Sequence, residues 1–360
     1  MSVEDAAIDL ENASNSLIEN NILEDVLFGI YLKNSPGSTI INNRITGKDL
    51  PLPERGDGIR LWYSSESKII ENTIKNARDL VIWWSSNTLI KNNEVAEGRY
   101  GLHYMYSNNN IFKDNLFKGN AVGGFLMYSG NIKFYRNVFT KNKGLASGYG
   151  VGFKDLDDVY AEDNMFIDNR VGIYMDNSPH LAHSWNELSN NIIAYNDVGI
   201  SMMPSIERNK IHGNSFIENY VQVEVRGGGV LKRNKWNIKS GGNYWSDYNG
   251  FDENQDGIGD MPYISEKLFE NLIDRNSVLK IFIHSPVSRA IELASEAFPV
   301  IKPEPKLKDD LPLSKPKLTA LKIKKTDNDS NEFLFLSIIM LVIPLAFYLF
   351  IIRHKDYYKC

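Results

Sequence analysis

Cysteine is almost absent from this sequence, because the only cysteine among the 360 residues is the last one, Cys360. A disulfide framework and a cysteine metal site are therefore excluded, and a soft metal ion would have to be bound by histidine and methionine. The solenoid region contains no basic run, and the formal net charge of the chain is −5. We expect no nucleic-acid partner. Glycine-rich phosphate loops, Ser-His-Asp sets and zinc motifs are absent as well.

What is present is a repeat. Ten times the chain has Asn, any residue, then a large apolar residue, at intervals of 23, 29, 21, 22, 22, 27, 27, 23 and 20 residues. A repeat of this length is too short for paired-helix arrays and fits a solenoid with one coil per repeat. The ten pairs are Asn20/Ile22, Asn43/Ile45, Asn72/Ile74, Asn93/Val95, Asn115/Phe117, Asn137/Phe139, Asn164/Phe166, Asn191/Ile193, Asn214/Phe216 and Asn234/Trp236.

Most coils open with a glycine followed by apolar residues two apart, as in Gly101-Leu102-His103-Tyr104, which is strand periodicity. Asn is unfavourable within strands but suits bends, where we expect it to adopt a left-handed conformation and to stack in a ladder. We predict an all-β fold: a right-handed, single-stranded parallel β-helix of roughly ten coils over residues 5–265. A leucine-rich horseshoe is the main competitor, but its Leu-x-x-Leu-x-Leu framing is missing.

Four segments are expected to follow the β-helix. Residues 266–298 have helical spacing and form either a cap or a docking segment for a membrane partner. Residues 299–332, rich in Pro and Lys, read as a linker. Residues 333–352 contain no charge and predict a transmembrane helix. Residues 353–360 contain basic residues, so the positive-inside rule predicts that they form a cytoplasmic tail. The solenoid would then lie outside the cytoplasm, tethered to the membrane by the helix.

The amino-terminal end raises a question of export. Met1-Ser2-Val3-Glu4-Asp5 is acidic and has no apolar signal-peptide core. The first coil also lacks a capping segment, so we expect a truncated start, with the export signal missing from this chain. The alternative is a tail-anchored protein whose solenoid is cytoplasmic.

A second motif follows the last coil. Side-chain oxygens of Asp252, Asn254, Asp256 and Asp260 take positions 1, 3, 5 and 9 of a calcium loop, with Ile258 at position 7, where such loops supply a backbone carbonyl. Position 12 lacks the bidentate glutamate. A structural calcium ion and an ion-free turn both remain open.

The strand register indicates which side chains leave the core. Counted from the glycine-like position of each coil, offsets +1 and +3 face inward, and offset +4 faces outward. The outward column contains Trp62, Trp83, Met105, Met127 and Met203, and the next column contains Tyr63, Trp84, Tyr106 and Tyr128. These residues predict an exposed aromatic and thioether stripe. A register error of one residue would bury it.

A transient copper site is the chemistry this stripe suggests. Met105 and Met127 would be vertical neighbours, with His103 two residues from Met105, and two thioethers with an imidazole suit copper(I). Met203, in the same column, and His180 and His183, in a longer coil, are further copper candidates.

An enzyme hypothesis rests on Asp155, Asp157 and Asp158, because parallel β-helices often use clustered carboxylates in uronate lyases and epimerases or in glycosidases. Here a solvated turn is the favoured interpretation.

Four segments in order resemble the NosD family, accessory proteins of nitrous oxide reductase maturation: 56–64, 99–107, 148–158 and 285–299. The resemblance implies a periplasmic, non-enzymatic β-helix that works with an ABC transporter, made of a NosF-like ATPase and a NosY-like permease. It also implies that copper from a NosL-like chaperone is received while the copper centres of nitrous oxide reductase are assembled. His103 and Met105 fall in a family-like motif. A polysaccharide-binding protein, or a uronate-polymer lyase or epimerase, is the alternative function.

Overall fold

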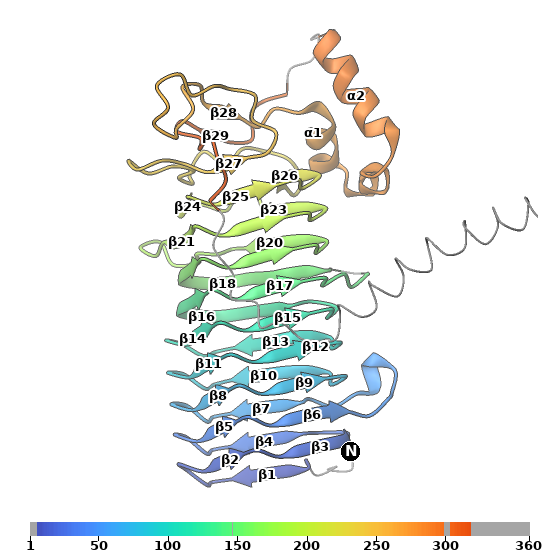
Figure 1. The fold of residues 1–360 in the computed structure, drawn as a ribbon, viewed down its shortest axis with the longest axis vertical. Helices are drawn as coiled ribbons and strands as arrows, with labels where there is room; N and C mark the ends of the chain where they lie inside the picture. Colours follow the sequence, from blue (N-terminus) through green and yellow to red (C-terminus); the bar gives the residue numbers. More distant parts are fainter. Residues whose placement is uncertain (1–5, 146, 299–302, 318–360) are drawn as a thin grey trace, which may run out of the picture. The chain divides into compact units, whose positions relative to one another are not determined.

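The computed structural model describes residues 6–145, 147–298 and 303–317. From Ile8 to Trp245 the chain winds into a right-handed parallel β-helix of about nine turns, each lying on the one before (Figure 1). Each turn adds strands to three faces, and each strand pairs in parallel with its equivalent one turn away. The predicted all-β parallel β-helix is confirmed, with about nine turns instead of ten.

The strands of the three faces are as follows. The first face contains β1 (Ile8–Glu11), β4 (Ile30–Lys33), β7 (Ile59–Trp62), β10 (Asp79–Trp83), β13 (Tyr100–Met105), β16 (Gly124–Tyr135), β18 (Tyr149–Glu162), β20 (Val171–Asp176), β23 (Val198–Met202) and β26 (Val221–Val225). The second contains β2 (Leu17–Glu19), β5 (Thr39–Ile41), β8 (Lys68–Ile70), β11 (Leu89–Lys91), β14 (Ile111–Lys113), the later parts of β16 and β18, β21 (Asn186–Ser189) and β24 (Asn209–His212). The third contains β3 (Ile22–Val26), β6 (Arg44–Gly47), β9 (Thr73–Lys75), β12 (Glu94–Ala96), β15 (Leu116–Lys118), β17 (Val138–Thr140), β19 (Met165–Ile167), β22 (Ile192–Ala194), β25 (Ser215–Ile217) and β27 (Tyr244–Trp245). A short 3-10 helix, η1 (Leu52–Glu54), interrupts the second turn.

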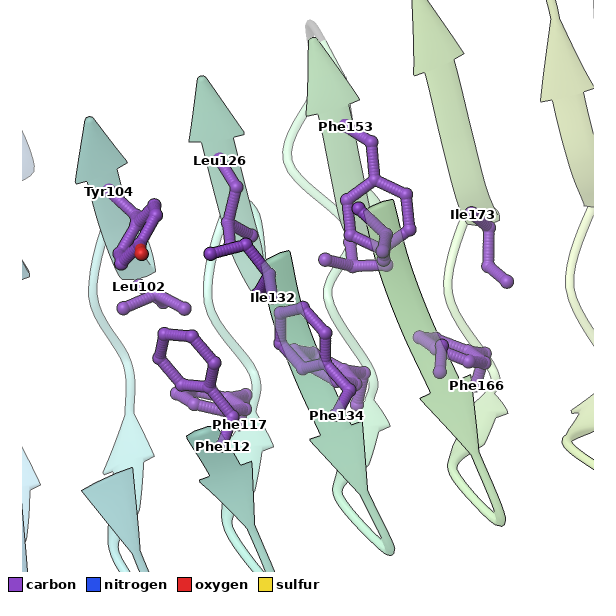
Figure 2. Close-up of a cluster of buried hydrophobic side chains, with 14 of the residues drawn as sticks. Leu102, Tyr104, Phe112, Phe117, Leu126, Ile132, Phe134, Phe153, Phe166 and Ile173 are labelled. Carbon is purple, nitrogen blue, oxygen red and sulfur yellow. The ribbon is translucent and has the colours of Figure 1, made fainter. Parts of the chain in front are cut away.

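The core runs through the centre of the turns. Inward positions are apolar in every turn, because side chains alternate along each strand and one set must leave water. Like residues stack on like: the rings of Phe112 and Phe134 are 4.8 Å apart (Figure 2). The rings of Phe139 and Phe166 are 5.2 Å apart. This stacking fixes the vertical register of the turns, so the position of each outward side chain is fixed as well.

Buried asparagines stabilise one bend of each turn. The side-chain amide of Asn115 donates to Oδ1 of Asn137 at 2.8 Å and to the carbonyl of Ile90 at 2.9 Å. Its backbone N–H also donates to Oδ1 of Asn137, at 3.1 Å. Each asparagine thus satisfies bend groups that the strand ladders leave unpaired. The predicted ladder is present, and its repeated hydrogen bonds explain the Asn spacing of the sequence.

The ladder differs from the prediction in two details. It begins at Asn21 instead of Asn20 and ends at Asn243 instead of Asn234, which joins a separate row. The left-handed backbone lies one residue before the ladder, for example at Asn42, where φ is +53°. The chain reverses at that residue, so the ladder amide can point into the coil.

A helical segment packs on the outside of the upper turns (Figure 1). It consists of α1 (Leu268–Arg275), the 3-10 helix η2 (Ser277–Phe282) and α2 (Pro286–Ala297). Phe269, Ile273 and Ile283 form one cluster with the outward side chains of Tyr174 and Val221. The segment therefore covers the upper part of the first face.

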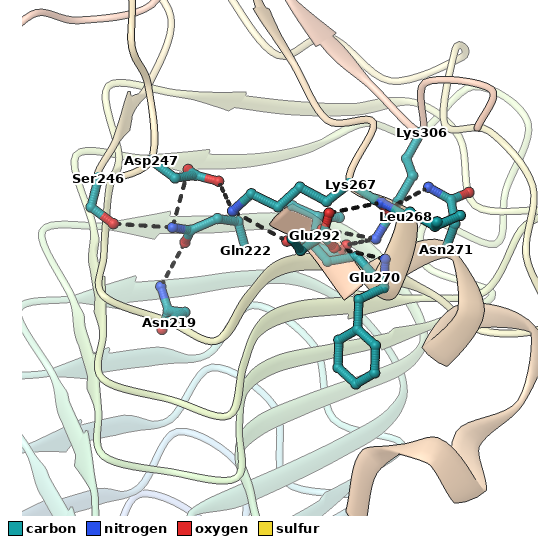
Figure 3. A network of polar contacts seen from close by, with 12 residues as sticks. Asn219, Gln222, Ser246, Asp247, Lys267, Leu268, Glu270, Asn271, Glu292 and Lys306 are labelled. Carbon is teal, nitrogen blue, oxygen red and sulfur yellow. Dashed lines mark hydrogen bonds and ion pairs between the residues drawn. The ribbon is translucent and has the colours of Figure 1, made fainter. Parts of the chain in front are cut away.

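Residues 303–317 were expected to belong to a linker, and this prediction is wrong for them. β29 (Lys308–Asp309) pairs antiparallel with β28 (Tyr263–Ile264). Lys306 is completely buried, and its ammonium lies 3.1 Å from Glu270 and 3.0 Å from Asp274 of α1 (Figure 3 shows Glu270 and Lys306). Two buried carboxylates hold this lysine, so the segment is anchored to the solenoid.

Within the described ranges, no helix is both long and apolar enough to cross a bilayer. The transmembrane helix predicted at 333–352 and the tail at 353–360 lie outside those ranges, as do residues 1–5.

Candidate functional site

The candidate site lies on the outer side of β7, β10, β13 and β16. Register pairs align Trp62 with Trp83, Trp83 with Met105, and Met105 with Met127. All four side chains are half-buried and point outward, whereas Leu102 and Tyr104 on the same strand are completely buried. The predicted inward and outward offsets therefore hold in this part of the chain.

Four aromatic residues follow these strands and form a second column. Their rings stack almost parallel: Tyr63 on Trp84 at 5.3 Å, Trp84 on Tyr106 at 5.1 Å and Tyr106 on Tyr128 at 5.2 Å. Because neighbouring rings cover both flat faces of Trp84 and of Tyr106, only the ring edges of these two residues can contact solvent. A platform that stacks on sugar rings needs free faces, which these two residues do not offer. We call these four residues, with Trp62, Trp83, Met105, Met127 and His103, the aromatic–methionine surface.

His103 is held from behind by a buried carboxylate. Its Nδ1 lies 3.2 Å from Oδ2 of Asp79. The same carboxylate accepts hydrogen bonds from the guanidinium of Arg99, and its Oδ1 accepts the backbone N–H of Tyr100. Burial alone would raise the pKa of Asp79, but the hydrogen bonds from His103 and Arg99 hold that pKa below its ordinary value. Asp79 is therefore an ionised acceptor, so Nδ1 of His103 carries the proton and Nε2 has its lone pair free for a metal.

Asp79 was missed by the sequence prediction, although a signal was present. It occupies the position at which most other coils have glycine. A carboxylate at a position that most coils fill with glycine indicates specific side-chain partners, and these are His103 and Arg99.

The donor set of the site fits copper(I). Met105 and Met127 are direct register partners on adjacent strands, so their Cα atoms are about 4.8 Å apart, and His103 is on the same outer side of β13. Two thioethers and one neutral imidazole are soft ligands that select copper(I) over zinc, calcium or magnesium. The residue types therefore suit such an ion without any cysteine, and copper binding by these three residues stays a prediction.

The other copper candidates do not join this group. Met203 packs partly against the core, and the ion pair of Lys154 with Asp176, at 2.8 Å, occupies the rungs between it and Met127. His180 is exposed and bonds Asn177 at 2.9 Å. His183 is exposed on the same loop. In the described part of the chain, no three His, Cys, Asp or Glu side chains form a metal cluster.

Asp155, Asp157 and Asp158 are occupied by structural contacts. Asp157 accepts the backbone N–H groups of His180 and Leu181 at 2.9 and 2.8 Å, and Asp158 accepts the hydroxyl of Ser184 at 2.8 Å. Asp155 bonds Asn177. These carboxylates fasten the loop that follows Asp176. They also do not line the cavity of about 600 Å³ that lies between residues 231–237 and 304–310.

The side-chain oxygens of the calcium-like loop accept hydrogen bonds from the loop itself. Asp252 accepts the backbone N–H groups of Asp256 and Gly257 at 3.1 and 3.0 Å, and Asp260 accepts that of Glu253 at 2.7 Å. Oδ1 of Asp256 accepts the N–H of Ile258 at 2.8 Å, and Oδ1 of Asn254 accepts that of Asp256 at 3.0 Å. Calcium binding at this loop stays a prediction.

The fold and this surface define a right-handed parallel β-helix protein that presents soft metal donors among aromatic side chains on a rigid outer face. The family model described as "Periplasmic copper-binding protein (NosD)" matches residues 41–250, and one for right-handed β-helix regions matches residues 2–79. The chain belongs to the NosD family.

Two relatives are both described as "Probable ABC transporter binding protein NosD". The one from Pseudomonas aeruginosa is 32% identical over 326 residues, which cover 86% of this chain and 73% of the relative. The one from Stutzerimonas stutzeri is 34% identical over 131 residues, covering 36% of this chain and 29% of the relative.

Among solved structures, the chain is similar to the periplasmic alginate epimerase AlgG, with 14% identity, a TM-score of 0.43 and coverage of 59% of this chain and 61% of that one. It is also similar to the A-module of an Azotobacter vinelandii mannuronan C-5 epimerase, with 12% identity, a TM-score of 0.41 and coverage of 61% and 76%.

Proposed function

We propose that this protein is a non-enzymatic periplasmic accessory factor that handles copper(I) while the copper centres of nitrous oxide reductase are assembled. The observation that carries the proposal is the outward register pair of Met105 and Met127, with His103 on the same face and oriented by Asp79. The family description, a periplasmic copper-binding protein, supports the compartment and the metal. The ion is cargo here: a NosL-like chaperone delivers it and the reductase receives it.

A half-exposed site suits transfer better than storage. Thioether ligands bind copper(I) without charge, and the site lies on the outer face of the strands, where a partner protein can reach it. Two thioethers and one imidazole hold the ion, so the ligands of a partner can replace them one at a time. The ion is therefore bound transiently between two proteins.

The helical segment is the proposed contact with an ABC transporter formed by a NosY-like permease and a NosF-like ATPase. Its apolar residues are not all used in packing: Val278 is 67% exposed, Ile281 72% and Leu293 57%. Exposed apolar side chains gathered on one short segment indicate an interaction surface. The description of both relatives as ABC transporter binding proteins supports this partner.

Copper(I) competition against a chelator tests the metal site. We expect about one copper(I) ion per chain for this surface, and an affinity at least tenfold lower in Met105→Leu and in Met127→Leu, since each loses one thioether. Met203→Leu is the matched control, because it removes a thioether from the same column outside the group, and it should leave the affinity unchanged. Equal affinity in all four proteins would overturn the proposed site.

Co-purification with the permease and ATPase tests the docking segment. Ile281→Asp should abolish capture, because it places a charge on the proposed apolar contact. Leu145→Asp is the control, since Leu145 is 96% exposed and lies outside the segment. Loss of capture in the control as well would contradict a specific contact through the helical segment.

The polysaccharide alternative has no specific observation in its favour. The stacked aromatic residues cover one another's faces, and Asp155, Asp157 and Asp158 bond the loop that follows Asp176. We therefore place the function in metal handling.

A further inference from the structure

Trp83 lies against the proposed ligands on one side and against a cation on the other. It is the register partner of Met105, and its ring centre is 4.9 Å from that of His103, with the two planes nearly perpendicular. On the preceding rung, the guanidinium carbon of Arg60 lies over the indole, 5.3 Å from its centre. The indole is thus placed between a permanent cation and the donor set.

The packing of Trp83 leaves its polar atom without a role in the fold. Nε1 is buried and has no hydrogen-bond partner among the described residues. A buried, unpaired donor costs about 1–3 kcal/mol. The neighbouring Trp62, in the same column, has no such buried orphan atom. A smaller apolar residue would avoid the cost at position 83, so the indole itself must contribute something.

The electron-rich face of an aromatic ring attracts cations, and tryptophan does so most strongly, within about 6 Å of the ring centre. An ion bound by His103 and Met105 would lie beside the indole of Trp83. Copper(I) is singly charged and satisfied by few soft ligands, so a ring can close its open side. Copper(II) and zinc(II) need further nitrogen or oxygen donors there, which an indole face does not supply.

We propose that Trp83 covers the side of the bound ion that His103, Met105 and Met127 leave open. Its indole face contacts the ion and makes the site selective for monovalent soft cations. The inference rests on the proposed function, because it assigns a role to a neighbour of the same ligands. It predicts binding of copper(I) and silver(I), and exclusion of copper(II) and zinc(II).

Titration of the full chain with silver(I) and copper(I) tests this assignment through indole absorption and fluorescence. Binding should shift the near-ultraviolet absorption and quench emission. Trp83→Leu should abolish the shift and weaken copper(I) binding about tenfold, the ratio that corresponds to a cation–π contact of about 1.4 kcal/mol. Trp83→Phe should lose the indole signal but keep more of the affinity, since a weaker ring remains.

Trp185→Leu is the matched control. Trp185 directly precedes β21, outside the aromatic–methionine surface, and the ammonium of Lys235 lies 5.0 Å from its ring centre. The variant therefore removes an indole beside a cation, and both the spectral shift and the affinity should persist. An unchanged shift and affinity in folded Trp83→Leu and Trp83→Phe would overturn the assignment of Trp83 alone. Unchanged copper(I) binding after Met105→Leu and Met127→Leu would instead refute the proposed function.

Discussion

Tyr63, Trp84, Tyr106 and Tyr128 hold a backbone conformation that bulky residues rarely adopt. Their φ angles are +50°, +47°, +52° and +52°. Such a conformation costs on the order of 1–3 kcal/mol per residue, and it persists only where the surroundings require it. Ring stacking offsets part of this cost. An asparagine or glycine would turn the chain with less strain, as in the neighbouring turn at Asn34, so the four aromatics indicate a surface kept for a purpose beyond folding.

The orientation of His103 can be tested at Asp79. Asp79→Leu removes the acceptor for Nδ1–H and should lower copper(I) affinity about 10- to 100-fold, the usual effect of losing a carboxylate behind a metal-binding histidine. Asp79→Asn keeps an acceptor oxygen and should lose less. Nitrogen NMR of the imidazole should show Nδ1 protonated in the natural protein and a mixture of tautomers in Asp79→Leu.

The matched control for Asp79 is Asp57. It is also buried, one turn lower, and pairs with Arg60 and Arg78 at 3.2 and 3.1 Å. Asp57→Asn should reduce stability without changing the tautomer of His103. If both aspartates alter copper affinity equally, Asp79 acts only through general stability.

At the scale of elements, α1 and the segment at 303–317 are joined by a buried charge group. Burial raises the pKa of Asp274 to about 6, against the opposing effect of Lys306. Glu270 also faces this lysine, and Lys267 lies 3.7 Å from Glu270. Two carboxylates share one buried ammonium, so one of them is easily protonated.

This group gives a prediction about stability and pH. The folded protein keeps the proton of Asp274 up to about pH 6, whereas the unfolded chain loses it near the ordinary value of 3.8. The folded state binds more protons in that window, so the free energy of unfolding should fall as the pH rises from 4 to 6, by up to about 3 kcal/mol. Asp274→Asn should flatten this dependence in denaturant unfolding measured at several pH values.

Lys306→Met provides the opposite change. It leaves Asp274 buried without its cation and Glu270 with Lys267 alone, which should destabilise the protein by about 3–5 kcal/mol at pH 7 and less at pH 4.5. An equal loss at both pH values would contradict the buried charge group as its cause.

The sequence predicts a structural feature when that feature depends on neighbouring residues of one strand, and it does not when the feature depends on contacts between distant residues. Period-2 alternation correctly places Leu102 and Tyr104 inside and Met105 outside, because side-chain direction follows from the strand alone. The burial of Lys306 is different. A lysine among prolines is typical of a linker, and its partners Glu270 and Asp274 lie more than 30 residues away in the sequence. No local pattern reports such a pairing.

The ends of the Asn ladder show the same limit. Asn243 replaces Asn234 as the last member because 29 residues separate Asn214 from Asn243, so the bend comes later than the sequence spacing suggested. Asn243 is then fixed by Asp309, whose Oδ2 accepts its backbone N–H at 2.7 Å. The two columns of the aromatic–methionine surface were predictable because their aromatic and methionine residues repeat at coil offsets +4 and +5. Its support by Asp79 was not, because it requires a contact between two turns.

At the scale of the whole solenoid, each turn contacts only its neighbours, so removing a complete turn should preserve the rest. Deleting residues 43–71, from one ladder asparagine to the residue before the next, would let Asn72 bond Asn21 as Asn43 now does. We expect a folded β-helix by circular dichroism and copper(I) affinity within about threefold, since Trp83, His103, Met105 and Met127 all remain.

Deleting only residues 43–57 is the control for this change. It removes part of a turn, breaks the ladder register and should prevent folding of the adjoining turns. Loss of copper binding in a folded 43–71 deletion would show that the site depends on more than the turns that carry it.

The most direct test of the copper site is X-ray absorption at the copper edge of the copper(I)-loaded full chain. The structure predicts two sulfur neighbours and one nitrogen neighbour, with sulfur scattering reduced in Met105→Leu and nearly absent in the double variant Met105→Leu/Met127→Leu. A copper environment made only of nitrogen and oxygen, or sulfur scattering unchanged in the double variant, would contradict the account.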